Sequence, residues 1–135
     1  MTSPQASQER TISKVSPRSV GETVARLVAL LGAKGIKVFS VIDQRAEARA
    51  VGLDLRETTL VVFGNPTAGT PLMQAVPLAA LDLPLKVLVW ADGDSVTQVS
   101  YTDPSVVAAR YGLTPEQAAV LEGVHTLTDA LVAPS

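Results

Sequence analysis

Residues 60–90 read LVVFGNPTAGTPLMQAVPLAALDLPLKVLVW, and the rest of the chain is organised around them. Two apolar runs, at residues 60–63 and 85–90, flank a segment that is crowded with Gly, Pro, Asn and Thr. Short apolar runs bounded by turn residues are typical of buried strands. The segment between them predicts an ordered, polar-lined loop that leads into a short helix. A binding site, if the chain has one, is expected here.

Strand patterns continue on both sides of this stretch. We expect strands at residues 10–15, 36–41, 58–63, 85–90 and 96–101. The unbroken apolar run of the third strand suggests that both of its faces are covered. Between the last two strands, Asp92-Gly93 is a strong hairpin signal. The pattern predicts an α+β domain with an antiparallel sheet of about five strands and helices mainly on one face.

The first helix is the strongest local signal, because apolar residues recur on one face through residues 17–34. Two starts are open: Ser16 caps with Pro17 following, or Ser19 pairs with Glu22 in a capping box. Further helices are expected at residues 45–50 after the cap Asp43, at 78–83 as a turn or short helix, after Asp103-Pro104, and after Thr114-Pro115.

Length and charge narrow the function classes. The 135 residues fit one domain, which we place at residues 10–133 behind a polar, disordered tail at 1–9. Apolar residues make up 47% of the chain, and self-association is one way to cover the excess. The net charge of −2 without a basic stripe argues against nucleic-acid binding. The chain has no cysteine and no apolar segment long enough for a membrane, so a cytoplasmic protein is expected.

The ordered motifs GNPTAGTPLMQ, LDLPLKVLVW and SYTDP resemble the bacterial and archaeal family called domain of unknown function 302. The resemblance covers roughly residues 10–113 and implies a curved sheet related to the TATA-binding-protein-like topology, together with a homodimer. It implies no settled activity. One branch of the family has cysteines where this chain has Gly64 and Leu85, and a nearer branch has histidines where it has Gln44 and Tyr111. Metal, haem or thiol chemistry at those positions is therefore not expected.

The loop at residues 64–70 has the glycine spacing of a phosphate-binding loop but lacks its lysine, and Pro71 stands where Ser or Thr is needed. Nucleotide hydrolysis is therefore disfavoured. A simpler anion-binding hypothesis remains, in which Thr70 caps a helix begun by Pro71 and the free N–H groups at that helix start hold an anion. The alternative is that Asn65 simply caps a tight connection. If the loop binds a ligand, its site residues are Gly64, Asn65, Thr67, Gly69, Thr70 and Gln74.

Three further side chains are candidates for chemistry. Lys86 interrupts an apolar strand and is either a desolvated base or a residue that protects a solvent-facing strand. Tyr101 and Asp103 could act as donor and base, although Asp103 also suits the cap of the next helix. His125 is the only histidine, so no histidine-based metal cluster is expected, and a surface or rim position suits it.

Three functions stay open. The preferred one is a homodimeric protein that binds a small molecule or anion with residues 64–74, to which Lys86 and Tyr101 add ligand contacts. The second is a cofactor-independent hydrolase or isomerase that uses Lys86, Tyr101 or Asp103, with Asn65 as an oxyanion donor. The third is a structural or protein-interaction module, which a loop with all its polar groups bonded internally would favour. No metal or cofactor is expected in any of them.

Overall fold

The computed structural model describes residues 10–134, so the tail predicted for residues 1–9 lies outside the described residues. Five antiparallel strands form one sheet in the order β1-β5-β4-β3-β2. The α+β class and the five-stranded antiparallel sheet are therefore confirmed. The strands are β1 (Thr11–Ser16), β2 (Lys37–Asp43), β3 (Thr58–Gly64), β4 (Leu85–Ala91) and β5 (Thr97–Thr102).

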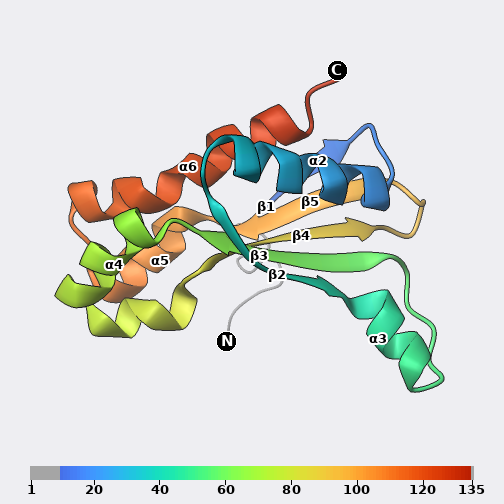
Figure 1. Cartoon of the computed structure of the whole chain (residues 1–135), viewed down its shortest axis with the longest axis horizontal. Helices are drawn as coiled ribbons and strands as arrows, with labels where there is room; N and C mark the ends of the chain where they lie inside the picture. The colour runs from blue at the N-terminus through green and yellow to red at the C-terminus, as the bar shows by residue number, and fades with distance from the viewer. Residues whose placement is uncertain (1–9, 135) are drawn as a thin grey trace.

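The helices cover one face of the sheet and its two ends. Figure 1 shows the two long helices, α2 and α6, side by side over the sheet, while α4, η1 and α5 gather at one end and α3 at the other. Their bounds are α2 (Val20–Ala33), α3 (Gln44–Ala50), α4 (Pro66–Ala75), the 3₁₀ helix η1 (Pro77–Asp82), α5 (Pro104–Tyr111) and α6 (Pro115–Leu131).

The core lies between this helical layer and alternate residues of the central strands. Leu27 and Leu31 of α2 and Leu131 of α6 are fully buried against the strand residues. Those strand residues are Val61, Phe63, Val87, Val89 and Val99. The intervening side chains of β3, Leu60 and Val62, point to the opposite face and keep part of their surface exposed. Within the single chain, the helices therefore cover only one face of this strand.

The first helix begins at its second predicted start. Ser19 is the N-cap of α2, and its Oγ accepts a hydrogen bond of 3.1 Å from the N–H of Glu22. Ser16 instead ends β1, where its buried hydroxyl lies 2.7 Å from that of Thr23. The start at Ser16 is wrong because the chain is still extended there and pairs with β5. Asp43, Asp103 and Thr114 cap their helices as predicted.

The edge strand β1 is attached to α6 by a half-buried lysine, Lys14. The Nζ of Lys14 lies 2.7 Å from Oγ1 of Thr128, 3.1 Å from the carbonyl oxygen of His125 and 2.7 Å from a carboxylate oxygen of Asp129. Only 20% of the Lys14 side chain is exposed. Because a charge so deeply placed must be hydrogen-bonded, Lys14 fixes the position of α6 over the edge of the sheet.

Candidate functional site

The connection after β3 forms a helix that begins five residues earlier than a cap at Thr70 implies. Asn65 is the N-cap of α4, and its Oδ1 accepts a hydrogen bond of 3.0 Å from the N–H of Thr67. Pro66 takes the first helical position, and Pro71 lies inside the helix. The predicted helix start at Pro71, with free N–H groups beside Thr70, is therefore wrong. The alternative, in which Asn65 caps the connection, is confirmed.

A hollow opens between this helix start and the chain that enters β4. We call it the loop pocket; its volume is about 170 Å³. Gly64, Asn65, Gly69 and Thr70 line one side of it. The other side is apolar and includes Phe39, Met73, Leu83, Pro84, Leu85 and Leu121. The pocket therefore combines the predicted loop residues with a wall that is almost entirely hydrocarbon.

The polar groups of the loop are largely bonded to the loop itself. The N–H groups of Ala68 and Gly69 donate to the carbonyl oxygen of Asn65 at 3.0 and 2.8 Å, and the Asn65 side chain takes the N–H of Thr67. A Cβ on Gly64 would lie 3.4 Å from Cβ of Pro84, which is an ordinary van der Waals contact, so Gly64 packs closely against this part of the wall. The backbone N–H groups at the start of the helix are thus used within the loop, and the pocket lining is mainly apolar.

A second hollow lies where β4 and β5 separate. These strands pair only between residues 88–91 and 97–100; beyond that point β4 continues along β3, and β5 along β1. The opening, which we call the strand-gap pocket, has a volume of about 90 Å³. It is lined by Asp82, Lys86, Tyr101, Thr102, Val107 and Leu121, among others. Leu85 and Leu121 border both pockets.

Asp82 carries the clearest electrostatic perturbation in this region. The Tyr111 hydroxyl donates a short hydrogen bond to its carboxylate, and the Arg110 guanidinium lies 2.8 Å away. Tyr111 first, and then Arg110, hold the pKa of Asp82 below its usual range, with Lys86 adding a smaller attraction. The same carboxylate raises the pKa of Tyr111. Asp82 is therefore an ionised carboxylate already occupied by two donors.

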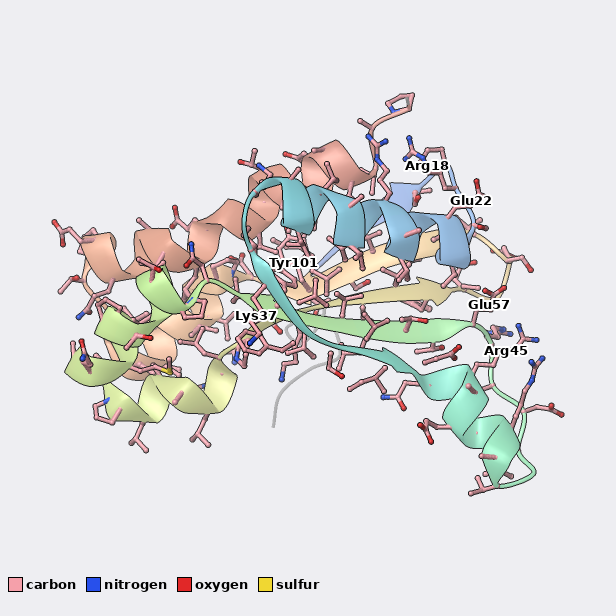
Figure 2. All side chains as sticks on the ribbon, in the orientation of Figure 1. Arg18, Glu22, Lys37, Arg45, Glu57 and Tyr101 are labelled. Atoms are coloured by element: carbon pink, nitrogen blue, oxygen red, sulfur yellow. The ribbon has the colours of Figure 1, made fainter. Side chains whose placement is uncertain are left out.

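Tyr101 lies between the sheet and the helices that cover it (Figure 2) and is only 4% exposed. Its hydroxyl oxygen is 2.7 Å from Nδ1 of His125, and the two rings meet edge to face. Asp103 uses its carboxylate to accept the N–H of Ser105 at 3.0 Å. Both candidates for acid–base chemistry therefore have structural partners, and His125 is a partner that the sequence interpretation left on the surface or rim.

Six of the eight predicted ligand-binding residues line one of the two pockets. Four of them line the loop pocket: Gly64, Asn65, Gly69 and Thr70. Lys86 and Tyr101 line the strand-gap pocket, and the exposed Thr67 and Gln74 line neither pocket. Lys86 is exposed, as the solvent-facing interpretation predicts. The enzyme hypothesis joins Lys86 to Asn65, but these residues line different pockets. Within residues 10–134, no three His, Asp or Glu side chains are grouped so as to hold a metal ion.

The sheet order and the helical layer define the class of the domain: an α+β domain in which helices cover one face of an antiparallel sheet. A family model described as "Domain of unknown function DUF302" matches residues 12–131. The chain therefore belongs to the DUF302 family, as the motifs of the central stretch indicate. The fold is similar to the crystal structure of the uncharacterized conserved protein DUF302 from Bacillus stearothermophilus. The TM-score is 0.77 at 17% identity, over 91% of this chain and 95% of that chain.

The chain is also similar in sequence to part of some longer proteins. The chain is 39% identical over 117 residues to "Fluoride-specific ion channel FluC 1" of Brucella suis biovar 1 (strain 1330), a match over 84% of this chain and 46% of the relative. The similarity to "Fluoride-specific ion channel FluC 2" of Brucella melitensis biotype 1 has the same identity and covers 43% of that protein. The chain thus spans less than half the length of these relatives. None of the helices described here is both long and apolar enough to cross a membrane.

Proposed function

We propose that this domain binds a small, mainly apolar molecule in the loop pocket. The observation that carries the proposal is a half-open hollow of about 170 Å³, whose lining combines Phe39, Met73 and Leu83 with the helix start at Asn65. An apolar cavity of about 150 Å³ is large enough to hold a molecule the size of benzene. Gly64 and Gly69 both line the pocket and add no side chain to its volume.

An anion is the less favoured ligand for this pocket. The curated relatives are named for fluoride, and a desolvated fluoride ion would need several hydrogen-bond donors or a positive charge around it. The first N–H groups of α4 are bonded to Asn65, and no lysine or arginine lines the loop pocket. A small apolar molecule requires none of these donors, so it suits the pocket better.

The test compares two probes and two leucine variants. Benzene is expected to shift the backbone amide signals of residues 64–74, and sodium fluoride is expected to leave them in place. Ala68→Leu places a larger side chain in the lining of the pocket and is expected to abolish the benzene response. Ala75→Leu, at an exposed position of the same helix, is the control and is expected to keep it. Unchanged amide signals with benzene would contradict the proposal, and a fluoride response at these amides would favour the anion instead.

We also propose that the domain is a homodimer. The family resemblance and the apolar composition support this assembly. So does the sheet face opposite the long helices, where Leu60, Leu88 and Trp90 keep part of their surface exposed. Sedimentation at micromolar concentration is expected to give twice the chain mass, and a monomer mass would exclude the dimer. Leu88→Lys, which places a charge on this face, is expected to shift the equilibrium to monomer; Leu81→Lys, on exposed η1, is the control.

A further inference from the structure

We propose that the strand-gap pocket is a second ligand site, one that takes a short-chain carboxylate with Lys86 as its cationic partner. This site is distinct from the loop pocket and does not depend on a ligand there. The inference rests on three features: a break in the sheet, a positive charge at that break, and a lining that is half polar and half apolar.

The break gives the site its shape. The ladder between β4 and β5 ends at the pair Leu88 and Ser100, although β4 extends to Leu85 and β5 to Thr102. Each strand stays hydrogen-bonded to its outer neighbour, so the strands separate without either of them ending. The space between them is closed from the helical side by Val107 and Leu121, both of which are buried.

The charge at this opening is left partly uncompensated. Lys86 forms no ion pair and no side-chain hydrogen bond with any residue that the structure describes in 10–134. Asp82 is the acidic residue that lines the pocket, and its carboxylate is held by Tyr111 and Arg110. Because Asp82 already accepts from Tyr111 and pairs with Arg110, it offsets the charge of Lys86 only in part. An anion beside Lys86 would therefore be attracted, and a second cation would be repelled.

The lining selects the kind of anion. Thr102 and Lys86 provide polar groups at the rim, whereas Leu85, Val107 and the ring of Tyr101 provide hydrocarbon surface further in. The volume of about 90 Å³ corresponds to roughly three water molecules, at about 30 Å³ each. A carboxylate at the rim with a tail of a few carbons uses both parts of the lining. Phosphate would use only the rim and would leave the apolar part empty.

The experiment titrates the full chain with sodium butyrate, with neutral butyramide of the same shape, and with inorganic phosphate. Butyrate is expected to shift the backbone amides of residues 85–87, 101–102 and 107, and to bind at least tenfold more tightly than butyramide. Lys86→Met keeps the side-chain stem but removes the charge, and is expected to weaken butyrate at least tenfold. Lys37→Met, an exposed lysine on β2, is the matched control and is expected to change the affinity less than twofold.

Three results would overturn the proposal. They are equal binding of butyramide and butyrate, unchanged butyrate binding by the folded Lys86→Met variant, and phosphate shifts equal to those of butyrate at the same amides. Val107→Phe, which fills the apolar end, is a second variant; its melting curve establishes folding, and retained butyrate binding by the folded protein would also contradict the site. Ala68→Leu is expected to keep butyrate binding, so failure of the loop pocket and failure of this site can be told apart.

Discussion

Replacement of Lys14 by methionine is expected to destabilise the domain, because it removes the attachment of β1 to α6 while keeping most of the buried side-chain stem. Two hydrogen bonds from the ammonium, to Thr128 and to the carbonyl oxygen of His125, contribute about 1.5–3 kcal/mol each. The ion pair with Asp129 adds less than about 1 kcal/mol, since 72% of that carboxylate side chain is exposed. Desolvation of the ammonium offsets several of these kcal/mol, which leaves a net loss of about 2 kcal/mol.

This loss is measured by urea unfolding, followed by circular dichroism and by the fluorescence of Trp90. A loss of about 2 kcal/mol corresponds to a melting temperature about 6–8 °C lower for a domain of this size. Lys34→Met, at an exposed lysine after α2, is the control and is expected to change stability by less than about 0.5 kcal/mol.

The pH dependence gives a second check on Lys14. Burial disfavours its ammonium, but Asp129 and Tyr101 outweigh burial and raise the pKa of Lys14 above its usual value. Because the pKa of Lys14 is higher in the folded state than in the unfolded state, its ammonium stabilises the fold at pH values below the unfolded pKa of about 10.4. This stabilisation is lost as the pH rises above that value and through the folded pKa. The difference between wild type and Lys14→Met is therefore expected to stay constant from about pH 6 to pH 9. The reasoning is refuted if the variant unfolds within about 0.5 kcal/mol of wild type, or if a double-mutant cycle assigns the whole loss to Asp129.

Three further predictions concern single positions. Tyr111 and Arg110 lower the pKa of Asp82 in the folded protein. The ionised carboxylate therefore stabilises the fold above the usual Asp pKa of about 3.9, and this stabilisation is lost as the pH falls through the lower pKa of the folded state. Asp82→Asn is expected to flatten this acid dependence of the melting temperature. Gly112 ends α5 at φ +60°, so Gly112→Ala is expected to cost about 1–2 kcal/mol in urea unfolding, and an unchanged midpoint would contradict this. Val61→Ala, at a fully buried position, is expected to cost about 2–3 kcal/mol, and a loss below 1 kcal/mol would contradict the burial of β3.

The starts of α3, α5 and α6 were predictable because their signals are local. A cap such as Asp43, Asp103 or Thr114 bonds an N–H only two or three residues away, so the sequence contains both partners within one turn. The choice between Ser16 and Ser19, which the sequence left open, shows the limit of this information. Ser16-Pro17 and Ser19 are both acceptable starts locally, and only the pairing of β1 with distant β5 decides between them.

The contacts that shape the site join residues far apart in the sequence, and no local pattern specifies them. Tyr101 meets His125 across 24 positions, and Asp82 meets Tyr111 across 29. The inward position of Lys14 did leave a signal, because it lies between Ile12 and Ser16 in the period-two alternation of β1. That period places all three side chains on one face, and Ile12 packs against the core.

The loop after β3 shows why a polar sequence can build an apolar pocket. Each polar group that made residues 64–70 resemble an anion-binding loop is also suited to closing a tight connection, and the structure uses Asn65 in that way. Once the N–H groups of Thr67, Ala68 and Gly69 are bonded within the loop, the surface left for the pocket is mainly hydrocarbon. The uncompensated positive charge lies instead at Lys86, in the separate gap between β4 and β5. Charge and apolar volume are thus divided between two sites, which is why the two proposals call for different ligands and can fail independently.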